Sequence, residues 1–462
     1  MATNTLAKQL AQWVVDLDYS DIPSDTLLHV KRCLLDNIGV QLRGSILPWV
    51  RPAYEYARST STPSSDHYAA VSYYGDRMSA EYAAFANSAF SYSCELQHHG
   101  APRSAHPGVI VIPTAMAIAE ELDINGRDLA TAIVAGYEVQ GRLGAAAFDA
   151  ILKNHFHPQG VLGVFSATAV AGKLLGLNSD KLAHAFGIAG SYASSILEYD
   201  HAGGEVKRIH GSMAARNGIQ SAKMAELGLT GPLTVFEGEN GVFSSFADGN
   251  VAVEGVLEEI GYPFCISHCR FRVYPTIGAC HNSLDIVHDL LATHDIDYKQ
   301  IDAIAVQMNP EMVAHVASVI RPHDVISAQA SLGYSIATLL VMGDNDLDRY
   351  FSAESWANPI ILGVADKVAA TALEDPANLL MTRLQIKFKD GQLICGEQIE
   401  PRGSESSPFP TSVLEAKFRA LVEPVLGRAR ANVILESLQA FETLDSLREL
   451  TPMLQRTDSR VQ

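Results

Sequence analysis

The sequence predicts a mainly α-helical protein, with a large all-helical domain and a smaller α+β domain, and three observations indicate this fold class. Residues 1–265 are rich in Ala, Leu and Ile at helical spacing. Short segments of alternating apolar and polar residues replace this pattern over residues 266–403. Helical spacing returns over residues 404–462, so we expect this C-terminal part to pack back on the first domain.

The helices of the first domain are predicted from their apolar faces, and most begin with a residue that caps helices well, such as Ser, Asn, Pro or Gly. Their expected ranges are residues 24–42, 79–90, 113–122, 126–143, 160–175, 179–194 and 212–227. Ala and Gly are frequent along them, so we expect close packing in one helical core.

The α+β domain is predicted from two strands and a turn. Residues 301–308 and 384–388 alternate apolar and polar side chains, as half-buried strands do. Asp390-Gly391 separates the second strand from residues 393–395 and predicts a hairpin turn. Helices are expected at residues 283–294 and 328–342, and in the C-terminal part at residues 412–421 and 431–450.

The composition excludes several kinds of protein. With 47% hydrophobic and 19% charged residues, the chain can bury sizeable cores and is unlike a disordered protein. The formal charge of −18 repels phosphate backbones and anionic lipids, so we expect neither nucleic acid nor a membrane surface as partner. No apolar run is long enough to span a membrane.

Cysteine and cofactor motifs give negative expectations. Cys265 and Cys269 are spaced more widely than a CxxC pair and no second pair exists, so we expect free thiols and no metal site. A cytoplasmic location follows, with the mitochondrion or another organelle still open. Walker, HExxH, EF-hand and GxSxG patterns are lacking. We therefore expect no cofactor and acid/base chemistry by side chains.

Residues 97–108 form the first candidate site, a polar loop with His98, His99, His106 and Arg103. Histidine titrates near neutral pH and arginine binds carboxylates through two parallel hydrogen bonds, so this loop suits proton transfer and anion binding. A solvated turn with one capping histidine explains the composition equally well. A histidine metal site is less favoured because the loop contains no carboxylate.

Two further candidates precede predicted helices. His157 stands before a helix N-terminus, where a carboxylate would be stabilised, although simple packing before Pro158 also explains it. Lys207, Arg208 and His210 follow two glycines and precede the helix expected from residue 212. This arrangement favours anion binding, and the alternative is a basic turn on an acidic surface.

A fourth and weaker group lies beyond the domain boundary, at Arg272, Tyr274 and His281. Tyr274 can donate a proton and Arg272 can hold a carboxylate. A strand residue beside a turn explains this group as simply.

These residues make the sequence resemble the MmgE/PrpD family, which includes 2-methylcitrate dehydratase, cis-aconitate decarboxylase and iminodisuccinate epimerase. The resemblance runs over nearly the whole chain. Several short motifs carry it, in order: His106-Pro107-Gly108, Ala135-Gly136-Tyr137-Glu138, His155-Phe156-His157-Pro158, Lys207-Arg208-Ile209-His210, Thr230-Gly231-Pro232 and Tyr274-Pro275. It implies a helical domain built from both chain ends, an inserted α+β lid domain, a homodimer, and an active site in the cleft without a cofactor.

The resemblance implies His106 and Lys207 as the active-site histidine and lysine, and His157 as a second histidine of the cleft. Gln97-His98 stand where members usually have an Asp pair. Because a neutral amide cannot act as a base, we expect His98 or His99 to take the proton, or the reaction to be altered. The expected catalytic set is His106, Lys207, His98, His99 and Tyr274, and the expected substrate-binding set is Gln97, Arg103, His157, Arg208, His210, Arg272 and His281.

The function implied is a cofactor-independent lyase of a small di- or tricarboxylate. We expect a carbon–oxygen lyase similar to 2-methylcitrate dehydratase, with a decarboxylase similar to cis-aconitate decarboxylase as the main alternative. An epimerase similar to iminodisuccinate epimerase, or a homologue that binds a carboxylate without turnover, are the others. In each reaction cations must stabilise an electron-rich centre, a role that suits Lys207, Arg208, Arg103 and Arg272.

Overall fold

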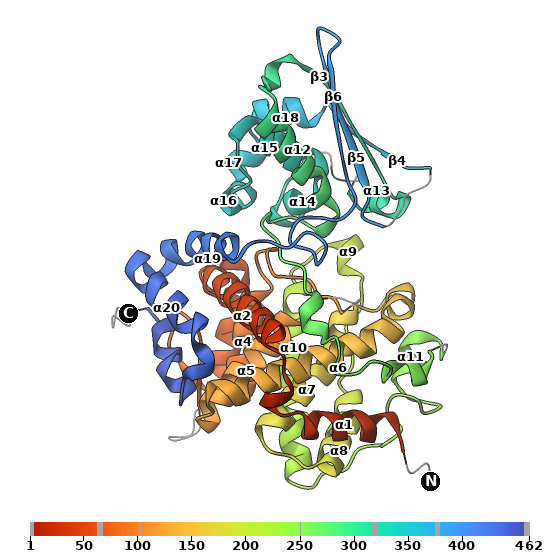
Figure 1. Ribbon diagram of the computed structural model, residues 1–462, viewed down its shortest axis with the longest axis vertical. Helices are drawn as coiled ribbons and strands as arrows, with labels where there is room; N and C mark the ends of the chain where they lie inside the picture. The colour runs from red at the N-terminus through yellow and green to blue at the C-terminus, as the bar shows by residue number, and fades with distance from the viewer. Residues whose placement is uncertain are drawn as a thin grey trace. The chain divides into compact units, whose positions relative to one another are not determined.

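The computed structural model describes residues 4–61, 68–100, 104–249, 251–316, 319, 321–374 and 379–456. The chain forms two compact units. The first comprises Met1–Ser93, Gln97–Arg270 and Pro410–Gln462, and the second comprises Phe271–Phe409 together with Cys94–Leu96. Helices dominate, which confirms the predicted mainly α class (Figure 1). Among the described residues, no helix combines the length and apolarity needed to cross a bilayer.

The first unit is helical apart from a short antiparallel pair, β1 (Ala69–Ala70) and β2 (Arg77–Met78). Its helices are α1 (Leu6–Asp16), α2 (Ser24–Ser45), α3 (Arg51–Thr60), α4 (Ala80–Ser91), α5 (Gly108–Leu122), α6 (Gly126–Lys153), α7 (Pro158–Leu174), α8 (Ser179–Gly190), α9 (Tyr199–Ala202), α10 (Lys207–Glu226), α11 (Val242–Ala247), α19 (Thr411–Leu426) and α20 (Arg428–Gln439).

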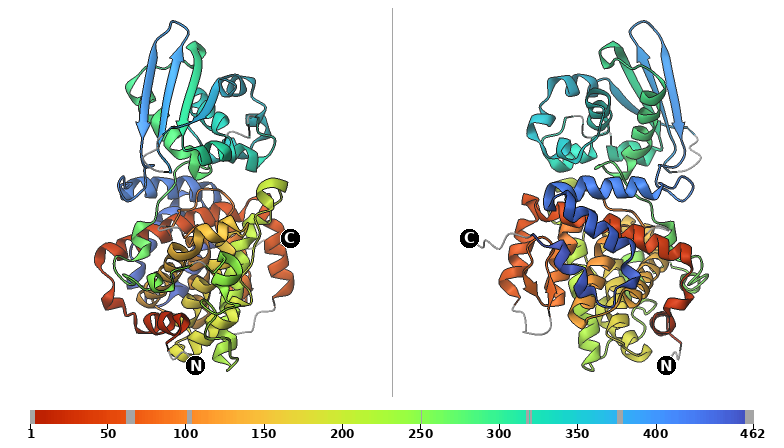
Figure 2. Two further views of the ribbon diagram at one scale, coloured as in Figure 1. Left: turned by 90° about the vertical axis from the view of Figure 1, so that its right-hand side faces the viewer. Right: turned by 60° about the vertical axis from the view of Figure 1, so that its left-hand side comes forward.

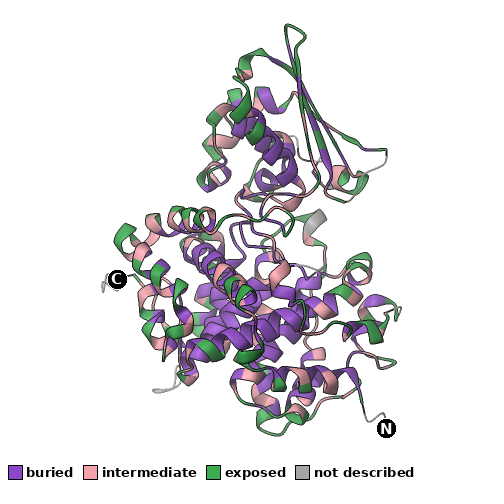
Figure 3. Ribbon diagram, viewed as in Figure 1, coloured by how far each residue is buried: buried purple, intermediate pink, exposed green. Residues whose placement is uncertain are grey.

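The core of this unit lies around α5, α6, α7 and α10, whose residues are mostly buried (Figure 3). Helix α7 packs against both α6 and α10. A Cβ added at Gly218 of α10 would lie 2.3 Å from the Ala167 Cβ of α7, so glycine permits this close approach. Helix α19 packs against α2, which returns the C-terminal segment to the first unit (Figure 2).

Two helices begin earlier than the sequence predicts. Helix α5 begins at Gly108 and not at Pro113, which lies inside the helix. Burial of Val109–Ile112 offsets the hydrogen bond that Pro113 cannot donate. Helix α10 begins at Lys207 and not at residue 212, so the cationic residues lie in its first turn and not in a loop.

The second unit contains a four-stranded sheet in the order β4-β3-β5-β6. Strands β3 (Ile301–Met308) and β4 (Val368–Ala372) are parallel, whereas β5 (Thr382–Phe388) is antiparallel to β3 and to β6 (Leu393–Gln398). Along β5, buried and exposed residues alternate, so one face is packed. Helices gather on that face (Figure 2). The predicted hairpin turn is present, with Gly391 at φ +92°.

The helices of the second unit are α12 (His281–Thr293), α13 (Pro310–Val316), α14 (Val325–Ala330), α15 (Leu332–Met342), α16 (Leu347–Phe351), α17 (Ala353–Trp356) and α18 (Pro359–Ala365). The single helix expected at residues 328–342 is divided at Ser331, whose hydroxyl accepts a hydrogen bond from the Tyr334 N–H and caps α15. Strand β4 was not predicted, because its small residues lack a clear alternation.

Candidate active site in the helical unit

His106 lies directly before α5 and is held in a fixed orientation. Its backbone N–H donates to Gln159 Oε1 and its carbonyl accepts from Gln159 Nε2, both at 2.9 Å. Its ring Nδ1 lies 3.1 Å from the His98 carbonyl oxygen. Because a carbonyl only accepts, Nδ1 carries the proton, and in neutral His106 the lone pair is on Nε2. This tautomer makes Nε2 the atom that exchanges protons.

Lys207 lies near His106 through a shared aromatic neighbour. The Lys207 Nζ is 5.7 Å from the centroid of the Tyr92 ring, and the His106 ring is 5.4 Å from the same ring. Lys207 is half-buried at the first position of α10, a helix with no acidic residue in its first turn. The lysine charge and the helix N-terminus therefore both make this region favourable for an anion.

His157 and His210 form a buried pair beside Lys207. Their Nδ1 atoms are 2.8 Å apart, so one ring donates a proton to the lone pair of the other. Burial, with the nearby Lys207 charge, lowers the pKa of His210 to about 4. The Tyr199 ring packs against both imidazoles. The pair is therefore a neutral hydrogen-bonding group at neutral pH.

Two buried side chains have polar atoms that make no hydrogen bond to any described residue. Arg208 is buried over the Trp49 ring and its Nε donates to Glu205, while its Nη2 lacks an acceptor within the described part of the chain. Gln97 is fully buried, and within that same part neither its amide oxygen nor its nitrogen has a partner. Because unsatisfied buried polar atoms are costly, both side chains are candidates for ligand contact.

His98, which the sequence predicts to be catalytic, has no exposed side-chain surface. Its Nδ1 is 2.8 Å from Asp36 Oδ2 and its Nε2 is 2.6 Å from the Tyr137 hydroxyl. Burial lowers the pKa of His98, but Cys33 and the Asp36 carboxylate raise it more, to about 9. In the described structure this imidazole serves the interior, and only its backbone carbonyl contacts His106.

Asp36 is the centre of this buried network. Its second oxygen accepts from Lys417 Nζ of α19 at 2.5 Å, and its first also accepts the His98 backbone N–H at 3.0 Å. Burial raises the pKa of Asp36, but Lys417 and His98 lower it more, so the group is ionised. Sequence reasoning missed Asp36, Lys417 and Tyr137. The one available signal was a carboxylate among the apolar residues of helix 24–42.

His99 is half-buried, and its backbone pairs with Arg270 through two hydrogen bonds of 2.8 Å. Its ring lies 5.0 Å from the His106 ring. The helical unit thus brings together His99, His106 and, around Tyr92, Lys207. Arg103 lies outside the described residues.

The remaining predicted residues belong to the second unit. Arg272 Nη1 lies 3.4 Å from Glu95 Oε2, and both side chains are buried. The Tyr274 hydroxyl donates to Asp285 Oδ1 at 3.1 Å, and burial with this carboxylate raises the pKa of Tyr274. The His281 ring packs against Tyr274, and its Nε2 lies 3.3 Å from a backbone carbonyl oxygen. These residues form one cluster within their own unit.

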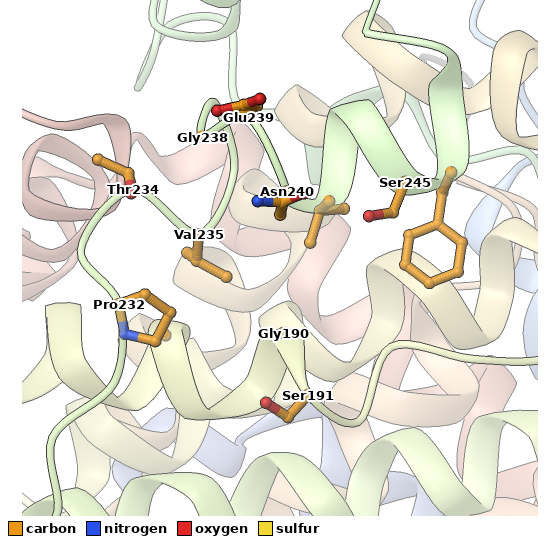
Figure 4. A pocket seen from close by; sticks show the side chains of 13 residues that line it. Gly190, Ser191, Pro232, Thr234, Val235, Gly238, Glu239, Asn240 and Ser245 are labelled. Carbon is orange, nitrogen blue, oxygen red and sulfur yellow. The ribbon is translucent and has the colours of Figure 1, made fainter.

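A cavity of about 380 Å³ lies elsewhere in the first unit, beside the end of α8 (Figure 4). Its lining includes Ser191, Thr234, Glu239, Asn240 and Ser245. None of the predicted site residues lines it, and Glu239 would repel a carboxylate. The histidine and lysine cluster therefore remains the better candidate for an anionic substrate.

Clustered His, Lys and Arg side chains on a helical unit define a class of protein suited to acid/base chemistry on a small anion. Comparison with known families makes the assignment specific. Residues 8–254 match the MmgE/PrpD N-terminal domain and residues 274–443 match the MmgE/PrpD C-terminal domain. The chain belongs to the MmgE/PrpD family, which confirms the resemblance found in the sequence.

Several characterised relatives align with the chain over nearly its full length. The cis-aconitate decarboxylase-like protein of Aspergillus oryzae is 28% identical, covering 96% of this chain and 96% of that protein. Cis-aconitate decarboxylase of Aspergillus terreus is 27% identical, covering 98% and 96%. Human cis-aconitate decarboxylase is 25% identical, covering 98% and 95%.

Proposed function

We propose that this chain is a cofactor-independent carboxy-lyase that decarboxylates cis-aconitate or a closely similar tricarboxylate. Relatives that bear the name cis-aconitate decarboxylase share nearly its full length, which supports this alternative over the dehydratase expected first. The observation that carries the choice is Gln97, a buried neutral amide at the position where the family usually has Asp. Dehydration needs a base to remove a proton, whereas decarboxylation needs only an acid.

The chemistry of cis-aconitate defines what the site must do. The bond between the methylene carbon and its carboxyl group breaks, and its electron pair moves through the neighbouring double bond as CO2 leaves. The former vinyl carbon, next to another carboxylate, then takes up one proton. The intermediate is an anion conjugated with that carboxylate, so fixed positive charges lower the barrier.

The helical unit offers groups for each task. Lys207 and the Arg208 Nη2 supply positive charge at the start of α10 and would hold substrate carboxylates. Protonated His106 would deliver the proton from Nε2, since its Nδ1 is engaged with the His98 carbonyl. The neutral His157–His210 pair would accept or donate hydrogen bonds to the third carboxylate without adding charge.

The test is proton NMR of the purified protein in D2O with cis-aconitate, 2-methylcitrate, citrate and iminodisuccinate in separate tubes. We expect two terminal vinyl signals from cis-aconitate, one deuterium on the adjacent methylene, and an equal amount of released CO2. Loss of the hydroxyl group from 2-methylcitrate without turnover of cis-aconitate would overturn the proposal in favour of a dehydratase. Absence of turnover in every tube would overturn it as well.

A further inference from the structure

A second group of reactive side chains lies beneath the loop and has no part in the proposed reaction. It consists of Cys33 in α2, His98 in the loop, and Cys269, which follows the short helical turn Cys265–His268. The two sulfur atoms and one ring nitrogen all lie within 4.8 Å of one another, and all three residues are buried. Two thiols and an imidazole are the donor set that zinc and similar soft divalent ions prefer.

The spacing is close to that of a tetrahedral site. Zinc binds sulfur at about 2.3 Å and nitrogen at about 2.0 Å, which places neighbouring ligands ~3.3–3.8 Å apart. The three atoms therefore need to move together by about an ångström at most, a change within the reach of side-chain rotation. No backbone rearrangement is required.

The surroundings of His98 match those of a metal-binding histidine. Such histidines usually donate their second ring N–H to a carboxylate, which fixes the ring and its tautomer. His98 Nδ1 is 2.8 Å from Asp36, which leaves Nε2 as the ligand atom. Asp36 is fixed in turn by Lys417. The Tyr137 hydroxyl, 2.6 Å from Nε2, is an oxygen donor within reach of the fourth position.

Gly108 limits what can stand beside Nε2. A Cβ added there would lie 2.3 Å from His98 Nε2 and 2.9 Å from the Tyr137 hydroxyl oxygen. Glycine is therefore required at the start of α5, and only backbone borders this side of the ring.

The charges also balance. A divalent ion cancels two thiolates, and Asp36 cancels Lys417, so a neutral His98 leaves the filled site without net charge. A buried cluster without net charge avoids the penalty of an uncompensated ion.

We propose that Cys33, His98 and Cys269 bind one divalent metal ion of the zinc class as a structural site. The ion would tie α2, the loop that precedes α5 and the segment at residues 265–270 together within the helical unit. This site does not depend on the proposed decarboxylation. The sequence did not indicate it, because the two cysteines are far apart along the chain and their nearest sequence neighbours are not ligands.

The test uses the full-length protein, purified without added metal, then dialysed against zinc or cobalt and freed of excess ion. Mass spectrometry of the elements should find one zinc per chain. The cobalt form should show the near-ultraviolet charge-transfer band of a cobalt thiolate and the visible bands of tetrahedral cobalt. Cys33→Ala and Cys269→Ala should each lower retained metal by at least about tenfold.

Cys265→Ala is the matched control, because this buried thiol lies in the same segment and outside the cluster. It should retain metal like the original chain. The proposal is overturned if the original chain retains no stoichiometric metal, if its cobalt spectrum lacks the thiolate band, or if Cys33 and Cys269 form a disulfide instead. The cobalt spectrum of the original chain decides the question even where a variant folds poorly.

Discussion

Replacing Asp36 with Asn is the sharpest test of the buried network behind the active-site loop. The amide keeps the shape of the carboxylate but removes its charge and turns one oxygen into an N–H2 group. Asp36 now accepts from Lys417 Nζ at 2.5 Å and lies 2.8 Å from His98 Nδ1. In Asp36→Asn, one of these two partners would face a donor in place of an acceptor.

The expected loss follows from burial. The Asp36 side chain has no exposed surface and Lys417 has 8%. Two unit charges about 4 Å apart interact by roughly 4 kcal/mol at an effective dielectric constant of 20. Removal of one partner from a buried ion pair costs about 3–5 kcal/mol. We therefore expect the free energy of unfolding of the helical unit to fall by about 4 kcal/mol.

Urea unfolding followed by tryptophan fluorescence measures this change. Trp13 and Trp49 lie in the helical unit, and a Trp356→Phe background removes the signal of the second unit. Asp180→Asn is the control, because this carboxylate is 82% exposed and only 3.9 Å from Lys8. It should change stability by less than about 1 kcal/mol.

A second variant separates charge from shape. Lys417→Met added to Asp36→Asn should restore more than half of the lost stability, because the ammonium group no longer lacks its carboxylate. The reasoning is refuted if Asp36→Asn unfolds at the same urea concentration as Asp180→Asn. It is also refuted if adding Lys417→Met deepens the loss.

Three further predictions concern the site. His106→Asn keeps a donor toward the His98 carbonyl but loses the acid, so CO2 release from cis-aconitate should slow by about 100- to 10,000-fold, while the exposed His155→Asn keeps full rate; equal rates would remove His106 from the chemistry. Arg208→Lys should raise KM about tenfold with a smaller change in kcat, because lysine cannot bind a carboxylate bidentately, and an unchanged KM contradicts substrate contact. His210 has a pKa of about 4 when folded and an ordinary value when unfolded, so the unfolded chain binds more protons between these values and stability falls as pH drops from about 6.5 to 4, by roughly 3 kcal/mol. His210→Gln should remove that part of the slope in urea midpoints measured across this range, and parallel slopes would contradict it.

Local patterns were sufficient to predict most helices and the first strand, because amphipathic spacing is a local property. The strand at Ile301–Met308 and the hairpin turn at Asp390-Gly391 lie where the alternation predicts them. Helix starts at Gly108 and Lys207 were missed, since Pro113 and the cationic residues are poor local signals there. Tertiary burial of the extra turns outweighs them.

Strand β4 shows a different limit. Its Val-Ala-Ala-Thr-Ala sequence has no preference strong enough to indicate a strand. Its parallel pairing with β3, from Ile304 with Val368 to Met308 with Ala372, supplies the hydrogen bonds. That partner lies more than sixty residues away, outside any local window.

The candidate site was predicted in its residue types better than in its connections. Motifs brought His106, His157, Lys207 and His210 forward, and the helical unit places them in pairs. Nothing local indicates that Lys417 reaches Asp36, which lies 381 residues away in the sequence. A carboxylate in the middle of an apolar helix predicts a buried partner, but not which one.

His98, His99 and His106 show why composition could not assign roles within one loop. Three histidines within nine positions have three environments: His98 buried against Asp36, His99 half-buried beside Arg270, and His106 fixed by Gln159. Their ring surroundings come from α2, from the segment near residue 270 and from α7, three parts of the chain that only the fold brings together. The side chain of His98 stabilises the interior, while its carbonyl sets the tautomer of His106. A residue can therefore control proton transfer through its backbone while its own imidazole remains out of reach of any substrate bound beside Lys207.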